Sequence, residues 1–431
     1  MVIRMKDSLN SSLVRNSAIQ VFWWIIFFPG FYSTDSFSAV SAAQSGGLEN
    51  VGTASWSLYV RYFSFFGNAI PLLTLISGLA LTYSVTCFAY SVFSRKIAAI
   101  SSLIMVATPV VYAMGITLWH DIPFTSGLIL ISAFFASQYR EVSVFKHSFW
   151  NLLLPGSILL TFKPNGLPTL VLFALFYFLL NRKKEVFKNL VSAIAIASIV
   201  TLGLSYLIVK EPPINSQFAQ QFMQFDISCF ASTEKGKGFV ERNIPGVSDS
   251  EGWSSPDACS FISRSKLSVE ERSRASNLIP VAWKTLVLEE PQFVIETHLR
   301  RHAYLLPIPI YGIPVEPFIH SNIEFKDRGI SWAFPEIAEN ARILPRFWNA
   351  ARGIFGWAGL WLLLMIVFIR FGSYKGLAPP TLLGLSQVLI LFVVAPIPDG
   401  RYALFVLITG QLILIGSIVG FITKNKGVSI E

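Results

Sequence analysis

The sequence predicts an all-α polytopic membrane protein, with about ten transmembrane helices and one large extracytoplasmic segment. Of its 431 residues, 53% are hydrophobic and only 14% are charged, whereas a soluble domain carries about 25% charged residues. The formal net charge is +9, but Lys and Arg lie mainly in short gaps between apolar runs. That pattern orients membrane proteins. It does not indicate a nucleic-acid partner, which needs basic residues clustered on one face of a folded domain.

Apolar runs long enough to cross a bilayer, about 20 residues in a typical helix, define the expected spans. They cover approximately Ala18–Tyr32, Asn68–Phe93, Ile97–Ile116, Ile122–Ser137, Ser148–Phe162, Gly166–Leu180, Leu190–Val209, Gly353–Ile369, Leu377–Val394 and Tyr402–Ile422. The fourth, fifth and sixth runs are short, so tilted or re-entrant segments remain open alternatives there.

Basic residues are distributed very unequally between the two ends of these spans. With the N-terminus in the cytoplasm, the following series falls inside: Arg4, Lys6, Arg15, Arg95, Lys96, Arg140, Lys146, Arg182, Lys183, Lys184, Lys188, Arg370, Lys375, Lys424 and Lys426. The short outer connections offer mainly Lys163 and Arg401, so the positive-inside rule places both termini in the cytoplasm. Val40-Ser41-Ala42 loosely resembles a signal-peptidase site, but it lies well past the first apolar run, and we expect an uncleaved anchor.

One connection is far longer than the others. It divides the chain into an N-terminal transmembrane module (1–209), an extracytoplasmic segment (210–352) and C-terminal transmembrane helices (353–431). The aromatic residues of this segment can supply a core, so it is not a disordered linker. Pro291 after Glu290 predicts a helix with proline in its first turn and an apolar face suited to the membrane surface. Prolines between Pro307 and Pro317 then interrupt regular structure.

Two of the three cysteines, Cys229 and Cys259, lie in the extracytoplasmic segment, and Cys87 lies in an apolar run. Their spacing matches no zinc site. In an oxidising compartment Cys229 and Cys259 could form a disulfide. Closing a loop of about 30 residues stabilises a protein by about 3 to 4 kcal/mol in the chain-entropy model. Two free thiols are an equally open alternative.

Charged and polar side chains gather at the outer ends of the spans. Asp35 follows the first span, and His120 with Asp121 joins the third and fourth. The turns after the fifth and ninth spans contribute Lys163 with Asn165, and Asp399 with Arg401 and Tyr402. Four separate outer turns thus present a charged residue at one membrane depth, which merely solvated loops would not require.

Each of these residues has a structural alternative. Asp35 and Asp121 both suit helix N-caps, the latter ahead of a proline. Lys163 and Arg401 could instead do no more than extend to the membrane surface or bind lipid headgroups. A histidine in the position of His120 is more often hydrogen-bonded at an interface than used as a ligand. The cluster favours function more strongly than any of its members alone.

Carboxylates and cations at the outer edge of the lipid suit one kind of reaction. A donor anchored by a polyprenyl tail presents its phosphate at that depth, where Arg and Lys can neutralise the departing group. Transfer of the sugar needs a base for the acceptor hydroxyl, which contributes about 10²- to 10⁴-fold in rate. A carboxylate in the first outer turn can supply it. The chain lacks the glycine-rich phosphate loop of a nucleotide site.

The same segments resemble the GT-C superfamily of membrane glycosyltransferases, particularly bacterial members that decorate surface glycans with polyprenyl-phosphate sugars. The resemblance extends along most of the chain and lies in Pro29-Gly30-Phe-Tyr-Ser-Thr-Asp35-Ser36, Trp119-His-Asp-Ile-Pro123, Lys163-Pro-Asn-Gly166, the Glu290-Pro291 helix and Pro398-Asp-Gly-Arg-Tyr402. It implies a GT-C-like fold in the bacterial inner (plasma) membrane. The implied reaction is inverting transfer of a hexose or pentose from a polyprenyl-phosphate donor to a cell-surface glycan or lipid-linked acceptor.

The resemblance also implies roles for the residues of the outer turns. Asp35 takes the position of the catalytic base, and Asp121 is a second catalytic candidate with a supporting role. Arg401, Lys163 and Arg301 are expected to contact the donor phosphate, and His120, Asn165, Asp399 and Tyr402 to bind substrate. Many relatives carry a second acid beside the first, whereas this chain has Ser36 there. A divalent metal is therefore not indicated, no cofactor is assigned, and membrane lipid is the remaining expected partner.

Two other classes of protein remain open. An O-antigen polymerase or ligase is also polytopic and handles a lipid pyrophosphate with arginines and a histidine, roles that Arg300, Arg301 and His302 would fit. The early Asp35 counts against it. A transporter or flippase would place binding groups near the bilayer midplane and often shows inverted repeats, whereas the strong charges of this chain sit at span ends.

Overall fold

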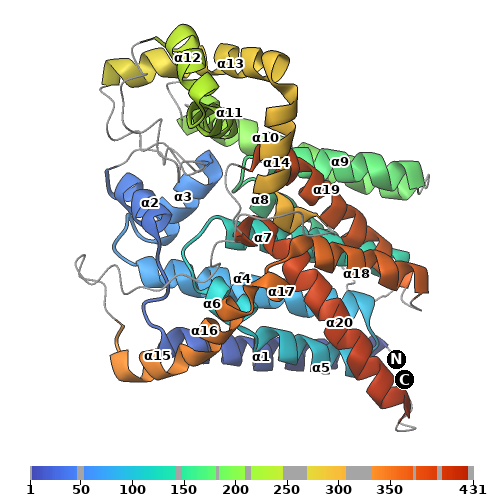
Figure 1. The fold of residues 1–431 in the computed structure, drawn as a ribbon. Coiled ribbons are helices and arrows are strands. Elements are labelled where there is room, and N and C mark those ends of the chain that lie inside the picture. Colours follow the sequence, from blue (N-terminus) through green and yellow to red (C-terminus); the bar gives the residue numbers. More distant parts are fainter. Residues whose placement is uncertain are drawn as a thin grey trace. The chain divides into compact units, whose positions relative to one another are not determined.

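The structure is a computed structural model, and it describes residues 2–45, 53–140, 148–180, 184–208, 215–245, 269–306, 332–371, 375–395 and 400–425. Within these ranges the regular elements are helices, apart from a single parallel bridge between Phe31 and Thr117. The all-α class predicted from the sequence is therefore confirmed for the described residues. Figure 1 traces the helices in chain order.

The chain forms two compact units. Unit 1 comprises Met1–Lys210, Val315–Ile390 and Asp399–Glu431, and unit 2 comprises Glu211–Pro314 with Leu391–Pro398. The predicted extracytoplasmic segment, 210–352, thus coincides with unit 2 only as far as residue 314. The later helices of that segment group with unit 1 because they pack against α1 and α6.

Unit 1 holds the apolar helices. Its elements are α1 (Val2–Ile26), α2 (Thr34–Ser45), α3 (Ala54–Phe63), α4 (Ile70–Val92), α5 (Arg95–Val106), α6 (Pro109–Gly115), α7 (Asp121–Tyr139), η1 (Phe149–Leu153), α8 (Leu154–Leu160), α9 (Gly166–Leu180), α10 (Lys184–Ile208), α15 (Pro335–Ala341), α16 (Ile343–Ala350), α17 (Arg352–Phe355), α18 (Ala358–Phe371), η5 (Lys375–Leu377), α19 (Ala378–Val394), η6 (Gly400–Ala403) and α20 (Leu404–Asn425). The last residues of α19 belong to unit 2.

Among the described residues, three helical stretches are long and apolar enough to cross a membrane: Ile70–Val92, Asp121–Tyr139 and Arg401–Lys424. A fourth is added if α5 and α6, which meet at an angle of 59°, form one span. Five further apolar helices are shorter. Helices thus occupy the predicted span positions, while the number of spans stays a prediction.

Two predicted spans differ from the structure in shape. At the first, Ala18–Tyr32, helix α1 begins at Val2 and ends at Ile26, so the last six residues of the predicted span are not part of this helix. The third, Ile97–Ile116, is broken at Thr108. Pro109 follows that residue, and a proline has no backbone N–H with which to continue the helix that precedes it.

Helices α1, α4, α5 and α7 form the centre of unit 1, with α4 packed against the other three (Figure 1). Asn16 Nδ2 of α1 donates to Thr86 Oγ1 of α4 at 3.0 Å and to Ser102 Oγ of α5 at 3.1 Å. Between α7 and α8, a Cβ added to Gly127 would lie 2.8 Å from Gly156 O. Small residues at close approach and polar contacts between helices are typical of packing in membranes.

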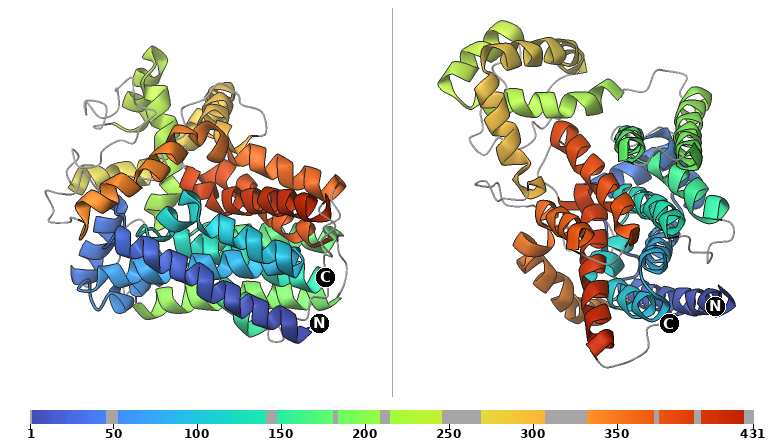
Figure 2. Two further views of the ribbon diagram at one scale, coloured as in Figure 1. Left: turned by 90° about the horizontal axis from the view of Figure 1, so that it is seen from below. Right: turned by 90° about the vertical axis from the view of Figure 1, so that its right-hand side faces the viewer.

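The predicted cytoplasmic ends of several helices meet at one end of unit 1. Ser8 Oγ, near the start of α1, lies 2.8 Å from Tyr90 Oη at the end of α4. Arg140, after the end of α7, donates to Ser91 O at 3.0 Å and to Phe93 O at 3.3 Å. The start of α1 and the end of α20 lie toward the same side of unit 1 in Figure 1 and in the left view of Figure 2, and they lie apart in the right view of Figure 2. This common end supports the predicted placement of both termini on one side.

Large apolar side chains are exposed along several of these helices. They include Leu175, Leu179 and Leu180 of α9, and Ile199 and Leu202 of α10. Exposed large apolar side chains are expected where a helix contacts lipid or another protein. The pattern agrees with helices that face lipid in unit 1.

Unit 2 is built from α11 (Asn215–Ala231), α12 (Glu234–Asn243), α13 (Val269–Glu289), α14 (Pro291–Arg301) and the 3-10 turn η3 (Ala303–Leu305). Its core contains Ile227, Phe230, Phe239, Val240, Ile279, Ala282, Leu286 and Val294. As predicted, Pro291 is the first residue of α14. Val294 lies in the core, so part of the apolar face of α14 is used inside the unit rather than on a membrane surface. Pro307 to Pro317 lie outside the described residues.

Candidate functional site

Backbone hydrogen bonds fix the turn after α1, predicted to be outer, to the connection that precedes α7. Phe31 N donates to Ile116 O at 3.0 Å, and Leu118 N donates to Phe31 O at 3.0 Å. Gly30 has a φ of +116°, and a Cβ there would lie 2.7 Å from Ile116 O. Glycine is required because other residues rarely adopt this φ and the two backbones leave no room for a side chain. The turn after α1 and the connection before α7 are thereby held side by side.

Gly30→Ala should therefore destabilise unit 1, at a cost of order 1–3 kcal/mol for the strained backbone, and lower the melting temperature in detergent. Gly203→Ala in α10 is a matched control, because nothing lies within 4 Å of a Cβ at that position. Alanine is also the better helix former there, by about 1 kcal/mol. Equal melting temperatures for the two variants would contradict the steric argument.

Ser33 and Ser36 cap the start of α2, which leaves Asp35 for another partner. Ser36 N donates to Ser33 Oγ at 3.4 Å, and Ser33 N donates to Ser36 Oγ at 2.9 Å. This reciprocal pattern resembles a capping box. Asp35 is thus not the cap of α2. Its Oδ2 instead lies 2.9 Å from Arg401 Nη1, and the Asp35 side chain is 34% exposed.

A second ion pair is buried. Lys163 Nζ, from the turn after α8, donates to Asp121 Oδ1, and the two side chains are 3% and 1% exposed. His120 Nδ1 lies 3.6 Å from Asp121 Oδ2. Although Asp121 opens α7, the N-cap position is His120, without a side-chain bond to the helix. Because buried charges persist only when paired, Asp121 and Lys163 hold each other in place.

The Tyr402 ring connects the two ion pairs, and the Trp119 ring lies beside Arg401. Lys163 Nζ lies 4.2 Å from the centre of the Tyr402 ring, and Arg401 Cζ lies 5.3 Å from the same centre. Arg401 Cζ also lies 4.9 Å from the centre of the Trp119 ring, whose Nε1 donates to Ser33 Oγ at 2.6 Å. Cations over ring faces are stabilised by the ring quadrupole. Sequence reasoning missed Trp119 and Ser33 as site residues, although both lie within two positions of predicted ones.

Asp35 and Asp121 differ in side-chain exposure, and this difference suits them to different roles. Asp35 is accessible enough to meet an incoming hydroxyl, whereas Asp121 is enclosed and bound to Lys163. A general base must come within hydrogen-bond reach of the proton that it takes, which favours Asp35. Within the described part of the chain, no three His, Cys, Asp or Glu side chains gather closely enough to hold a metal ion.

The remaining predicted site residues fall in different places. The His120 ring packs beside Trp56, with centroids 6.0 Å apart. Asn165 is buried, and its Oδ1 has no hydrogen-bond partner among the described residues. Asp399 lies outside the described residues, and Arg301 belongs to unit 2. The four turns that the sequence predicts to be outer do come together in unit 1, through a carboxylate or a cation from each.

The cysteines are only partly described. Cys229 is buried and disulfide-bonded, but Cys259 lies outside the described residues. The pairing of Cys229 with Cys259 therefore stays a prediction. Cys87 is a buried free thiol in α4.

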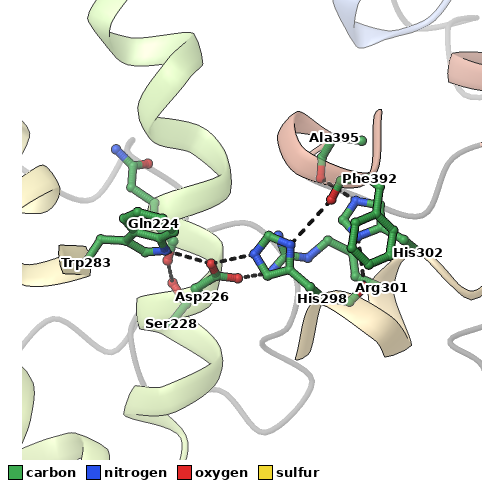
Figure 3. Close-up of polar contacts among 9 residues, drawn as sticks. All are labelled: Gln224, Asp226, Ser228, Trp283, His298, Arg301, His302, Phe392 and Ala395. Atoms are coloured by element: carbon green, nitrogen blue, oxygen red, sulfur yellow. Dashed lines mark hydrogen bonds and ion pairs between the residues drawn. The ribbon is translucent and has the colours of Figure 1, made fainter. Parts of the chain in front are cut away.

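A second buried polar cluster lies in unit 2, where three helices meet (Figure 3). Asp226 Oδ2 of α11 accepts a hydrogen bond from Trp283 Nε1 of α13 at 2.8 Å and lies 2.9 Å from His298 Nε2 of α14. Asp226 Oδ1 accepts a bond from Arg301 Nη2. Asp226 and Arg301 are both fully buried. A single carboxylate thus joins α11, α13 and α14.

Burial alone would raise the pKa of Asp226, but the hydrogen bond with His298 and the charge of Arg301 lower that pKa below its usual value. A carboxyl whose folded-state pKa is depressed stabilises the fold at pH values above its unfolded-state pKa. This stabilisation is lost as the pH falls through the lowered pKa. At neutral pH the cluster therefore stabilises unit 2. Sequence reasoning missed Asp226, which no motif surrounds.

Comparisons with known proteins add a loose structural likeness. No protein-family model matches the chain, and no curated protein matches it. Among solved structures, the chain is similar to ArnT from Cupriavidus metallidurans, crystallised with undecaprenyl phosphate. Sequence identity is 13%, the match covers 92% of this chain and 77% of that chain, and the TM-score is 0.39. At this TM-score the likeness says nothing about the site. The chemistry of the site is therefore argued from the residues of this chain alone.

Proposed function

We propose that the protein is a GT-C-type inverting glycosyltransferase that moves a sugar from a polyprenyl-phosphate donor to an acceptor at the outer face of a bacterial inner membrane. The observation that carries this proposal is the cluster in unit 1, where the partly exposed carboxylate of Asp35 pairs with Arg401 close to Lys163 and two aromatic rings. Asp35 follows the C-terminal end of α1, whose first turns lie at the end of unit 1 that we expect in the cytoplasm.

In the proposed reaction, the acceptor hydroxyl oxygen forms a bond to the anomeric carbon as the bond from that carbon to the phosphate oxygen breaks. Asp35 takes the hydroxyl proton, and the electron pair of the broken bond leaves with the lipid phosphate. Arg401 and Lys163 stabilise the negative charge on that leaving group. Asp121 supports the reaction by orienting Lys163. A single displacement inverts the anomeric carbon.

The proposal includes a topology of about ten spans, with both termini cytoplasmic and unit 2 on the outer side. The acceptor, a cell-surface glycan or a lipid-linked molecule, is then delivered from that side. A lipid-pyrophosphate polymerase or ligase that uses Arg301 and His302 is less well supported. Both side chains are fully buried and bind Asp226 and a backbone carbonyl. A transporter is disfavoured because the charged cluster lies at helix ends rather than at the midplane.

Donor binding can be tested with undecaprenyl phosphate itself, in nanodiscs of phosphatidylethanolamine and phosphatidylglycerol. Arg401→Ala should raise its dissociation constant by about tenfold or more, because a hydrogen bond between charged groups contributes about 1.5–3 kcal/mol. The dissociation constant of Arg401→Lys should fall between those of the unmodified protein and Arg401→Ala, since an ammonium keeps the charge but loses the planar fork of donors. Arg95→Ala, which removes an exposed charge at the other end of unit 1, should leave the constant unchanged.

The pattern among these three variants decides the outcome. If Arg401→Ala and Arg95→Ala bind undecaprenyl phosphate equally well, the phosphate role of Arg401 is wrong. If both weaken binding to the same degree, the lipid is attracted by net charge alone and not by a site. Only selective loss in Arg401→Ala supports a donor site beside Asp35.

A further inference from the structure

Four aromatic side chains are exposed in unit 1 at the point where α3 ends. Each of them is more than half exposed: Tyr62, Phe63, Phe65 and Phe66. Single apolar side chains on a surface need no explanation, but these four lie within one short stretch, which we call the aromatic turn. The Tyr62 and Phe66 rings meet edge to face, with centroids 5.8 Å apart. Their exposure requires either a structural reason or a partner.

The backbone of the aromatic turn has the hydrogen bonds of a Schellman motif, a common way to end a helix. Phe66 N donates to Arg61 O at 2.7 Å, and Phe65 N donates to Tyr62 O at 3.2 Å. The residue at the position of Phe65 in this motif is usually glycine and sometimes asparagine. Here the φ angles of Phe65 and Phe66 are +50° and +59°, which bulky side chains rarely adopt. Phenylalanine is therefore a poor choice for the backbone at both positions.

The residues on either side of the two phenylalanines hold this strained backbone in place. Ser64 is fully buried; its Oγ donates to Val60 O and accepts a hydrogen bond from Gly67 N at 2.8 Å. Gly67 has a φ of +85°, and a Cβ there would lie 2.6 Å from Gln44 Cγ of α2. Strain of this kind persists only where the surroundings fix it, and it often marks a functional site.

The core of unit 1 does not use the four aromatic side chains of the turn. Helix α3 enters the core through other residues, since Trp56 and Val60 are buried in a cluster that also contains Tyr32 and Phe162. The Trp56 ring is also the one that packs beside His120 of the candidate site. One face of α3 is thus satisfied inside the protein, while its last residues and the turn after it present aromatic rings to the surroundings.

The place of the aromatic turn in the chain indicates what these rings meet. Only Asn68 and Ala69 separate it from α4, Ile70–Val92, which is long and apolar enough to cross a membrane. Residues directly before such a helix lie at the level of the lipid headgroups, where aromatic side chains are enriched. Arg61 Cζ lies 5.3 Å from the centre of the Phe66 ring, and a guanidinium at this level suits lipid phosphates.

We propose that the aromatic turn is a lipid anchor: its four rings insert between the phospholipid chains beside the start of α4, with Arg61 at the level of the phosphates. The strained backbone is kept because it directs two adjacent phenylalanines outward where a glycine would otherwise stand. The inference goes beyond the proposed function, and it holds whether or not the candidate site transfers a sugar.

A spin label on the full-length protein in phosphatidylethanolamine and phosphatidylglycerol nanodiscs tests the anchor. The label is attached to Phe63→Cys, and its collisions with oxygen and with a water-soluble nickel chelate are compared. The oxygen-to-nickel ratio should exceed that of Lys237→Cys, an exposed position of the polar helix α12, by about threefold or more, because apolar solutes partition into lipid. The protein without a new cysteine gives the background signal, to which the buried thiol of Cys87 contributes.

Two outcomes of this comparison overturn the inference. A ratio equal to that of Lys237→Cys places the aromatic turn in water. A label shielded from both reagents shows that protein covers the turn, as a second copy of the chain or another partner would. If Phe63→Cys does not fold, Tyr62→Cys carries the same label from the preceding turn residue and gives the same comparison.

Two substitutions of Phe65 separate lipid contact from backbone conformation, with the label kept at Phe63→Cys. Phe65→Asn suits the positive φ better than phenylalanine does, but its amide is costly to place in lipid, so the oxygen-to-nickel ratio should fall by about twofold or more. Phe65→Leu suits the backbone no better but stays apolar, and it should leave the ratio nearly unchanged. Equal ratios for the two variants, or the opposite order, would overturn the anchor.

Discussion

Asp35→Asn should abolish sugar transfer, with turnover lowered by about 10²- to 10⁴-fold, the usual contribution of a general base. Asparagine matches the shape of aspartate but cannot accept the proton of the acceptor hydroxyl. The change should cost little stability, because the pair with Arg401 is partly exposed and exposed pairs contribute about 0–1 kcal/mol. Mass spectrometry of surface glycans from cells that carry only the variant measures the loss.

The matched control is Glu336→Gln in α15, which makes the same chemical change at an exposed carboxylate of unit 1. It should leave both glycan modification and protein level unchanged. Asp35→Asn should be present in the membrane at the same level and melt at the same temperature. Near-normal modification in this variant would remove Asp35 as the base, and loss of the protein itself would show a structural role instead.

The helices of unit 1 could be predicted because an apolar run long enough to cross a bilayer is almost always a helix. Packing explains why α1 extends beyond the apolar run of the first predicted span. The polar first half of α1 continues as helix because Ser8 and Ser12 meet the Tyr90 hydroxyl of α4, contacts that no local pattern reveals. The grouping of α15 and α16 with unit 1 likewise depends on packing against α1 and α6.

The sequence was enough to predict which residues form the candidate site, but not which of them form ion pairs with each other. The positive-inside rule gathers the charges of four outer turns on one side, and the structure brings them together. That Arg401 pairs with Asp35, while Lys163 pairs with Asp121, could not be predicted, because the partners are far apart along the chain. Asp226 could not be found at all from sequence, because its partners come from helices distant along the chain.

Lys163→Met should cause the largest loss of stability, about 3–5 kcal/mol, because it leaves the carboxylate of Asp121 buried without its cation. The side chains of both residues are almost fully enclosed, so solvent cannot take over the role of the lysine. Methionine approximates the length of the lysine stem, and the effect therefore reports the charge rather than a cavity. Thermal melting in detergent measures the loss independently of activity.

The double variant Lys163→Met with Asp121→Asn should recover much of this loss, since a neutral amide in the same place needs no counter-ion. We expect it to lie within about 1–2 kcal/mol of the unmodified protein, because replacing both members of a buried pair is often close to neutral. A double variant as unstable as Lys163→Met would show that the lysine acts through packing on Tyr402. It would also remove the argument that Asp121 exists to hold Lys163 at the donor site.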